Sequence, residues 1–287
     1  MIKNSNLITT AWSDYELIDS GDNRKLERYG SYVLIRPETQ AIWKPRRPEI
    51  WKDADTEFRF IDGKGSWKKG NTPESWQMSW DDVQFIIRLT SFKHTGIFPE
   101  QAVNWRWLEE RLEKITQPKV LNLFGYTGIA SIVAVQHGAS VTHVDASKQT
   151  NLWLKENAQV SGIPDTSIRC LFDDALKFTE REARRGAIYD GVILDPPAFG
   201  RGAKGEVWKI EEDLPKLLSA IKKVLSPKSG AFFLLNGYAA GYSPQSFFQA
   251  VESFFPKMNG EFGELQIGET DSDRTLPAGI YVRFTRN

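Results

Sequence analysis

The sequence of 287 residues contains little cysteine and no long uncharged apolar segment. Its single cysteine, Cys170, excludes an intramolecular disulfide and a zinc site built from cysteines, and we expect no metal site. The missing apolar segment argues against a membrane span, and the N-terminus lacks the apolar core of a signal peptide. The sequence therefore predicts a soluble cytoplasmic protein, and it does not specify the oligomeric state.

Net charge is also missing, because 37 basic side chains balance 37 acidic ones. Without excess positive charge, any surface that binds nucleic acid has to be local. Tryptophan is abundant instead, and six of the ten tryptophans lie in the first 80 residues: Trp12, Trp43, Trp51, Trp67, Trp76 and Trp80. This shift in composition predicts a small β-rich N-terminal domain, residues 1–93, ahead of a larger domain, residues 94–287.

Short runs of β-branched and aromatic residues predict strands in the first domain. They lie at residues 32–36, 41–43, 76–80 and 85–89, the last two joined as a hairpin. The tryptophans can fill the core of this domain or stack bases on an exposed sheet, and the core role is favoured. Two basic runs, residues 44–48 and 64–69, lie beside these aromatics and are either solvated or part of a binding surface.

The stretch from Lys119 to Asp145 reads as strand, glycine turn, helix and strand. Glycines in the turn Gly125–Gly128 permit positive φ, and a missing Cβ lets a ligand approach the backbone. Asp145 lies about 20 residues after the turn, where such units hold a ribose by its hydroxyls. The dinucleotide pattern G-x-G-x-x-G is absent. We therefore expect a cofactor that contains a nucleoside.

The remaining chain repeats this alternation and ends in two strands without a helix between them. Helices are expected at residues 100–115, 147–158, 175–185, 214–225 and 244–255, and strands at 168–172, 191–194, 231–235, 264–267 and 280–284. This pattern predicts a Rossmann-like α/β fold, a doubly wound, seven-stranded and mostly parallel sheet with an antiparallel C-terminal hairpin. Ligands bind at the carboxyl ends of such strands, which here carry Gly125–Gly128, Asp145, Asp174 and Asp195.

The most informative short motif is Asp195-Pro196-Pro197-Ala198-Phe199, directly after an expected strand. Two prolines make the turn rigid and remove N–H donors, so its carbonyls can face a substrate amine. Phe199 can stack on a planar base. Together with the three upstream strand ends, the motif indicates a site for a base-like substrate.

The motifs FGYTG, HVDAS and DPPAF, in this order, resemble those of class I S-adenosylmethionine-dependent methyltransferases. More closely, the chain resembles the bacterial branch that contains the 23S ribosomal RNA cytosine-C5 and guanine-N7 methyltransferases. HTGIFPEQ at residues 94–101, WLKENAQVSG at 153–162 and RTLPAG at 274–279 are similar to that branch. The resemblance extends over residues 94–284.

This resemblance implies S-adenosyl-L-methionine as the cofactor and RNA, in particular ribosomal RNA, as the substrate. The implied cofactor-binding residues are Phe98, Gln101, Phe124, Gly125, Tyr126, Thr127, Gly128, Asp145, Ala146, Ser147, Asp174, Ala175 and Asp195. In this set the glycine turn would contact the methionine part, Asp145 the ribose and Asp174 the adenine amine, while Phe98 and Gln101 would close the site. The implied catalytic residues are Asp195, Pro196, Pro197, Phe199 and Asn236.

The position of the cysteine favours methylation of a nitrogen. Transfer to cytosine C5 needs a thiolate that adds to the ring, and the cytosine enzymes carry it after the fifth strand. The corresponding stretch, residues 234–238, reads LLNGY, and Cys170 is expected in a strand as a small core residue. A nitrogen needs in-line placement and an acceptor for any leaving proton, which Asn236 and the DPPAF turn can supply.

Other interpretations stay open at this point. A methyltransferase acting on protein or on a small molecule is compatible with zero net charge, and so is a non-catalytic RNA-binding module with the same fold. An NAD(P)-dependent oxidoreductase is disfavoured by the missing G-x-G-x-x-G. The loop with Arg201, Lys204 and Lys209 is either a lid that contacts phosphate or an ordinary solvated loop.

Overall fold

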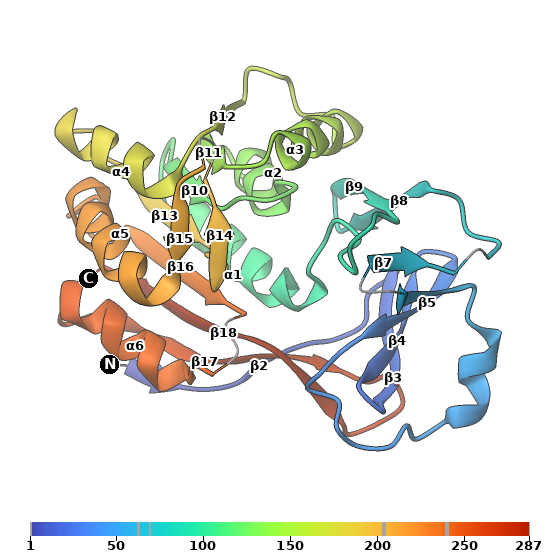
Figure 1. Cartoon of the computed structure of the whole chain (residues 1–287). Coiled ribbons are helices and arrows are strands. Elements are labelled where there is room, and N and C mark those ends of the chain that lie inside the picture. The colour runs from blue at the N-terminus through green and yellow to red at the C-terminus, as the bar shows by residue number, and fades with distance from the viewer. Residues whose placement is uncertain (1, 62–63, 69, 203–204, 239–240, 287) are drawn as a thin grey trace. The chain divides into compact units, whose positions relative to one another are not determined.

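The computed structural model describes residues 2–61, 64–68, 70–202, 205–238 and 241–286, which form two units (Figure 1). The α/β unit consists of Met1–Leu7, Asn104–Glu264 and Gly279–Asn287, and the β unit of Ile8–Val103 and Leu265–Ala278. The expected single boundary between residues 93 and 94 differs from this division. The C-terminal part of the chain enters the β unit once, and the first residues belong to the α/β unit.

The sheet of the α/β unit has the order β1-β17-β18-β16-β13-β10-β11-β12. Its strands are β1 (Ile2–Asn4), β10 (Lys119–Leu123), β11 (Ser140–Asp145), β12 (Ile168–Phe172), β13 (Gly191–Leu194), β16 (Phe232–Gly237), β17 (Asn259–Gly268) and β18 (Thr275–Thr285), and β2 (Leu7–Thr9) also pairs with β17. The neighbouring strands β12, β11, β10, β13 and β16 run parallel to one another, and β18 runs antiparallel to β16. This confirms the expected mostly parallel sheet with a C-terminal hairpin, while β1 and β2 raise the number of described strands from seven to nine.

Helices cover both faces of this sheet (Figure 1). They are α1 (Ala102–Leu112), α2 (Ile129–Gln136), α3 (Lys148–Val160), α4 (Ala175–Arg184), α5 (Ile210–Val224) and α6 (Pro244–Phe254). Leu121, Leu123 and Leu194 share one buried cluster with residues of α4, α5 and α6. Side chains alternate across a strand, so Asn122 points the other way and bonds Ser131 of α2. Among the described residues, no helix is long and apolar enough to span a membrane.

In its described residues, the β unit contains two sheets and two 3₁₀ helices. Its elements are β3 (Tyr15–Gly21), β4 (Arg24–Tyr29), β5 (Tyr32–Pro37), β6 (Thr56–Ile61), β7 (Lys64–Trp67), β8 (Ser75–Trp80), β9 (Val83–Arg88), η1 (Pro48–Asp53) and η2 (Pro99–Gln101). The predicted strand at 32–36 and the predicted hairpin are confirmed. The predicted strand at 41–43 is wrong, because Ala41 and Trp43 accept hydrogen bonds from the β3–β4 turn instead of joining a ladder.

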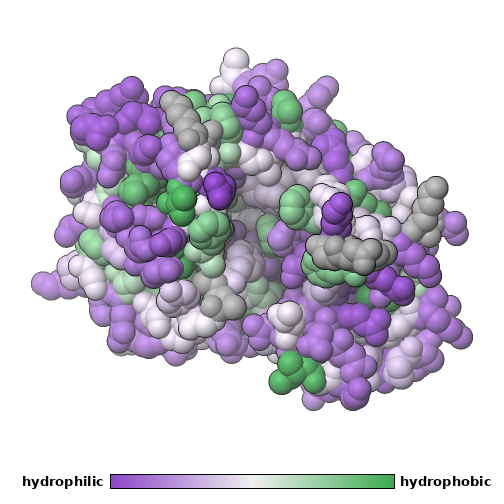
Figure 2. Space-filling view, viewed as in Figure 1, coloured by the Kyte–Doolittle hydropathy of each residue, from purple (hydrophilic) through white to green (hydrophobic). Residues whose placement is uncertain are grey.

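The N-terminal tryptophans are structural, as the favoured interpretation expects. Five indole N–H groups donate to acceptors of the same unit: Trp12 to Ser79 O (2.8 Å), Trp43 to Ser20 O (3.0 Å), Trp51 to Asp19 Oδ2 (2.8 Å), Trp67 to Thr90 O (2.9 Å) and Trp76 to Tyr29 O (3.0 Å). Trp80 is buried. These hydrogen bonds anchor the tryptophan side chains within the β unit. On the face that Figure 2 shows, the hydrophobic residues occur in small separate groups among hydrophilic ones.

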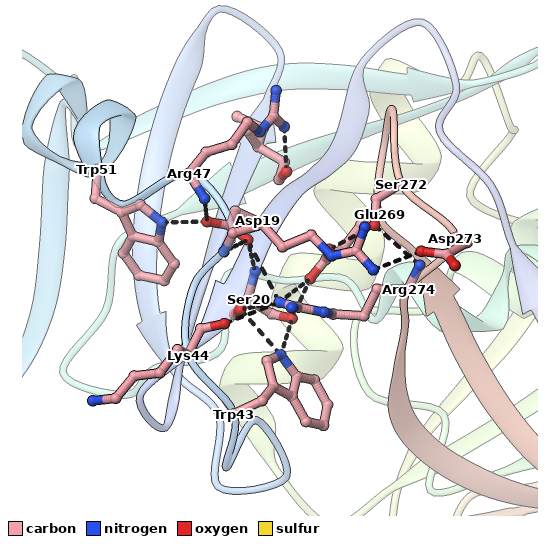
Figure 3. A network of polar contacts seen from close by, with 12 residues as sticks. Asp19, Ser20, Trp43, Lys44, Arg47, Trp51, Glu269, Ser272, Asp273 and Arg274 are labelled. Atoms are coloured by element: carbon pink, nitrogen blue, oxygen red, sulfur yellow. Dashed lines mark hydrogen bonds and ion pairs between the residues drawn. The ribbon is translucent and has the colours of Figure 1, made fainter.

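The basic run at residues 44–48 is used inside the β unit (Figure 3). Buried Asp19 accepts hydrogen bonds from the backbone N–H groups of Arg46 and Arg47. The side chains of this run donate as well: Lys44 to Asp22, Arg46 to Asp273 and Arg47 to the carbonyl of Ile18. These cations are therefore already paired or bonded within the chain. In the second basic run, Lys64 and Lys68 are exposed and Lys69 lies outside the described residues.

Candidate functional site

The glycine turn after β10 is fastened to the next strand and to α3. Gly125 N donates to Val144 O (3.2 Å), and Tyr126 N donates to Asp145 Oδ2 (2.9 Å). Phe124 and Tyr126 have φ values of 55° and 51°, in the left-handed region that non-glycine residues seldom occupy. Such backbone costs about 1–3 kcal/mol per residue and occurs mainly at functional sites. The hydrogen bonds to β11 hold this turn in place.

Packing under the turn explains both of its glycines. A Cβ at Gly125 would lie 2.3 Å from Cε1 of His143, and a Cβ at Gly128 would lie 1.9 Å from Cδ1 of Leu154. Gly128 also has a φ of 84°. The expectation that the missing Cβ atoms serve the approach of a ligand is therefore replaced by an internal reason, since the protein itself occupies that space.

His143 is a residue of this region that the sequence does not reveal. It is fully buried on β11, and its Nδ1 lies 3.0 Å from Oγ of Ser131, which also accepts from Asn122 Nδ2 (2.9 Å). Burial lowers the pKa of His143 to about 3, so the ring stays neutral. The neutral ring of His143 packs against Gly125 of the turn. In the sequence, only its position two residues before Asp145 in the same strand could have indicated this role.

Asp145 joins the turn to the start of α3. Its Oδ2 accepts from Tyr126 N, and its Oδ1 accepts from Ser147 N (2.9 Å) and Thr150 Oγ1 (2.8 Å). Burial raises the pKa of Asp145, while these three hydrogen bonds oppose the rise. A carboxylate offers about four acceptor positions, so the three donors leave capacity for a hydroxyl. Ser147 caps α3 by accepting from Thr150 N (3.3 Å), and Ala146 lies between Asp145 and Ser147 in the chain.

Asp174 occupies the corresponding position after β12. Its Oδ1 caps α4 by accepting from Lys177 N (2.8 Å), and Ala175 begins the helix and is buried. Asp174 Oδ2 lies 2.9 Å from where a Cβ at Gly202 would be. One carboxylate oxygen thus has a structural role, and contact with an adenine amine stays a prediction.

The Asp195–Phe199 motif follows β13 and leads into the hairpin of β14 (Phe199–Arg201) and β15 (Val207–Lys209). Pro197 O accepts from Trp208 Nε1 (2.7 Å), and Ala198 O accepts from Ile210 N (3.1 Å). These two carbonyls thus have internal donors, one from β15 and one from the start of α5 (Ile210–Val224), and the expected contact of the turn carbonyls with a substrate stays a prediction. Pro196 is buried, and 59% of Phe199 is exposed, which leaves its ring accessible.

Trp208 connects the two ends of this region. Besides its bond to Pro197, its buried ring lies 4.9 Å from the ring of Phe124, edge to face. The side chain thereby fixes the motif after β13 against the turn after β10. Sequence reasoning missed it, because a tryptophan nine residues beyond the motif carries no signal by itself.

Asn236 lies near the end of β16, one residue after Leu235, the last residue of that strand that pairs with β13. Leu194 pairs with Leu123 of β10 and with Leu235 of β16, so Asp195, directly after β13, and Asn236 of β16 each follow one of these paired leucines. Asn236 is buried, and its Oδ1 accepts from Nδ2 of Asn104 (2.9 Å). Asn236 and Asp195 therefore both lie near the carboxyl edge of the sheet, and their part in catalysis stays a prediction.

Cys170 behaves as a structural residue. Its Sγ donates to Oδ1 of Asn151 (3.2 Å), and Asn151 Nδ2 donates to the carbonyl of Asp145 (3.1 Å). Burial raises the pKa of Cys170, which disfavours the thiolate that a nucleophile requires. Cys170 lies in the middle of β12, and its side chain contacts α3 through Asn151.

Some predicted residues stay untested. Phe98 precedes η2 and Gln101 ends it, and both belong to the β unit, so their role in closing the cofactor site stays a prediction. In the loop after the motif, Arg201 is exposed and Lys209 pairs with Glu212 (2.8 Å). Lys204 lies outside the described residues.

Comparison with known proteins identifies the fold and its chemistry. The S-adenosylmethionine-dependent methyltransferase family matches residues 55–253, more than half of the chain. This chain belongs to that family. The structure of an S-adenosylmethionine-dependent methyltransferase from Agrobacterium tumefaciens is 42% identical with a TM-score of 0.93, and the match covers 99% of this chain and 94% of that one. A structure from Streptococcus mutans with 18% identity and a TM-score of 0.75 shares the fold over 95% of this chain and 75% of its own.

Relatives at the sequence level are ribosomal RNA methyltransferases. Ribosomal RNA large subunit methyltransferase K/L of Pseudoalteromonas translucida is 34% identical over 156 residues, which are 54% of this chain and 21% of the relative. The protein of the same name from Vibrio cholerae is 31% identical over 172 residues, 59% of this chain and 23% of the relative. The chain thus spans less than a quarter of the length of these relatives.

The site fits S-adenosylmethionine, the cofactor of this family. The strained turn and the acceptor capacity of Asp145 meet at adjacent strand ends, where doubly wound sheets bind ligands. When bound, the cofactor supplies an electrophilic methyl group on a sulfonium. The predicted fold class, enzyme class and cofactor are therefore confirmed, whereas the individual contacts stay predictions.

Proposed function

We propose that this methyltransferase transfers a methyl group to a nitrogen of a base in RNA, with ribosomal RNA as the substrate. The observation that carries the proposal is the exposed ring of Phe199, which ends the motif Asp195-Pro196-Pro197-Ala198-Phe199. An aromatic side chain at the carboxyl edge of the sheet offers a face on which an unstacked base can lie. The ribosomal RNA relatives support an RNA substrate.

Nitrogen as the methylated atom follows from the cysteine. The chain has one cysteine, and Cys170 lies within β12 with its thiol bonded to Asn151 and its pKa raised by burial. Methylation of C5 in a pyrimidine requires a thiolate next to the base. A nitrogen lone pair attacks the methyl group directly, so in-line placement by the motif suffices. Guanine N7 is the closest precedent within the resembling branch.

A second candidate is a protein or small-molecule substrate. Two observations favour it: zero net charge, and the internal ion pairs of Lys44, Arg46 and Lys209, which leave fewer cations for phosphate. A substrate without a phosphate backbone does not need such cations.

The test uses S-adenosylmethionine with a labelled methyl group and separate pools of undermethylated ribosomal RNA and cell protein. We expect label in RNA, and nucleoside mass spectrometry then identifies an N-methylated base. Label on C5 of cytosine would contradict the cysteine argument. Label in protein alone, or in neither pool despite cofactor binding, would refute the RNA proposal and favour the second candidate.

A further inference from the structure

A chain of buried polar side chains runs from β16 through α1 to β18 and β17 within the α/β unit. Asn104 Nδ2 donates to Oδ1 of Asn236 (2.9 Å), and Asn104 Oδ1 accepts from Nη1 of Arg283 (2.9 Å). Arg283 also donates through Nε and Nη2 to Glu261 Oε1 (3.0 and 2.7 Å). Asn104, Asn236 and Arg283 are all at least nine-tenths buried. The bonds among these three side chains therefore form away from competing water.

The chemistry of arginine gives the chain a direction. A guanidinium group donates and never accepts, so the amide of Asn104 has to turn its oxygen toward Arg283. Its NH₂ group then faces Asn236, and the amide of Asn236 has to turn its oxygen toward Asn104. Consequently the NH₂ group of Asn236 is directed away from Asn104 as a donor. The reverse orientation would set donor against donor in a buried place, where an unmade hydrogen bond is costly.

Arg283, the source of this direction, is held firmly. Its guanidinium lies 5.1 Å from the ring centre of Trp107 and 5.3 Å from that of Tyr281. Burial alone would raise the pKa of Glu261, but the hydrogen bond and charge of Arg283 bring it below its usual value. Glu261 therefore remains charged as the counter-ion of Arg283 at neutral pH. Ser5 Oγ donates to Glu261 as well (3.1 Å).

We propose that Arg283 and Asn104 are positioning residues that hold Asn236 as a hydrogen-bond donor to an acceptor atom of the target base. Asn236 and Asp195 follow the paired residues Leu235 and Leu194, at the carboxyl edge where doubly wound sheets bind their ligands. The inference rests on the proposed function, because it takes a base as the substrate. It also replaces the prediction that Asn236 accepts a leaving proton.

This orientation indicates which kind of group lies next to the methylated nitrogen. An exocyclic amine must lose a proton on methylation and is best met by acceptors, whereas a ring nitrogen that attacks through its lone pair releases none. The carbonyls of Pro197 and Ala198 already accept from Trp208 and Ile210, and Asn236 presents a donor. With the Asp195 carboxylate as an acceptor at the same edge and Asn236 as a donor, the arrangement therefore suits a base that carries a hydrogen-bond acceptor next to the methylated nitrogen.

The test is Asn104→Asp. An aspartate still accepts from Arg283, but it offers only acceptors to Asn236, so the Asn236 amide turns over and presents its oxygen to the base. We expect kcat on RNA to fall about 10- to 100-fold, while the Kd of S-adenosylhomocysteine, measured by calorimetry, stays within about twofold, since no cofactor contact changes. Asn71→Asp adds the same charge at an exposed site of the β unit and controls for charge alone.

A double-mutant cycle separates positioning from general stability. If Asn104 acts through Asn236, Asn104→Asp causes no further loss of kcat in an Asn236→Ala background. Equal losses in both backgrounds, or an unchanged kcat for Asn104→Asp, would overturn the inference. A second readout needs no activity: the side-chain amide NMR signal of Asn236, assigned with Asn236→Ala, has to shift in Asn104→Asp, and a signal that stays in place would also overturn it. Wild-type protein that binds cofactor and labels no RNA would instead refute the proposed function.

Discussion

Replacement of Asp145 by asparagine tests the cofactor site most directly. The carboxylate accepts from Tyr126 N on one oxygen and from Ser147 N and Thr150 Oγ1 on the other. Asparagine has the same shape but one acceptor oxygen and one donor group. Whichever way its amide turns, an NH₂ group meets a backbone N–H, at Tyr126 or at Ser147. The variant therefore disturbs both the turn and the site for the ribose.

The size of the effect follows from these contacts. A hydrogen bond to a charged group contributes about 1.5–3 kcal/mol, so losing one to a ribose hydroxyl lowers cofactor affinity by about 10- to 100-fold. The donor facing another donor at Tyr126 or Ser147 also lowers the free energy of unfolding by about 1–3 kcal/mol. Because Phe124 and Tyr126 already have strained backbone, the turn has little capacity to rearrange.

Calorimetric titration with S-adenosylhomocysteine and urea unfolding measure the two effects separately. Thr150→Val is the matched control, because it removes one donor to Asp145 (2.8 Å) but leaves the carboxylate and its charge. We expect this control to lose about 1 kcal/mol of stability and to keep its Kd within about threefold. A folded Asp145→Asn variant with wild-type affinity for the cofactor would refute the ribose assignment and leave Asp145 as a purely structural residue.

Three further predictions concern neighbouring residues. Cys170→Ser should keep full methyl transfer to RNA, and a folded but inactive variant would reopen the C5 interpretation. Trp208→Phe keeps an aromatic side chain but removes the indole N–H that donates to Pro197 O (2.7 Å) and part of the buried ring, so we expect urea unfolding to show a loss of at least about 1 kcal/mol, and kcat to fall while cofactor affinity is retained. His143 has a folded pKa of about 3, below its ordinary value near 6.5. As the pH falls below 6.5, only the unfolded chain binds this proton, so stability decreases by about 1.4 kcal/mol per pH unit until pH 3. Urea unfolding between pH 7 and 5 should show this slope reduced in His143→Gln, and equal slopes would contradict it.

The α/β unit was largely predictable because each of its elements carries a local signal. The parallel strands are short apolar runs that are followed by glycine or aspartate. Ser147 and Asp174 are typical N-cap residues and predict the starts of α3 and α4. These patterns arise from burial on both sides of the sheet and from unsatisfied N–H groups at helix starts. The extra strand β1 was missed because Ile2–Asn4 is half exposed and has no alternating pattern.

The β unit was predicted less well, because charged residues lie inside it. Strands β3 and β4 read YELIDSG and RKLERY, which suggests an exposed segment. Glu27 is nevertheless fully buried and pairs with Arg36 of β5 at 2.7 Å. Burial alone would raise the pKa of Glu27, but Arg36 and Lys25 bring it to about 2, so the carboxylate stays charged in the core. Only the tertiary pairing of these strands makes such a pattern compatible with burial.

The same distinction separates the parts of the candidate site. The residue types at the carboxyl edge, from Gly125 to Asp195, were visible because they follow strands directly. What each group presents to a substrate was not, because it is decided by partners far away in the chain. In our proposal, Arg283, 47 positions after Asn236, orients the Asn236 amide through Asn104 so that its NH₂ group faces the substrate. The carbonyl of Pro197 already accepts a hydrogen bond from Trp208. The chemistry of the site is therefore set by the hydrogen bonds of the folded unit, and variants of Asn104 and Trp208 test it more sharply than variants of the motif itself.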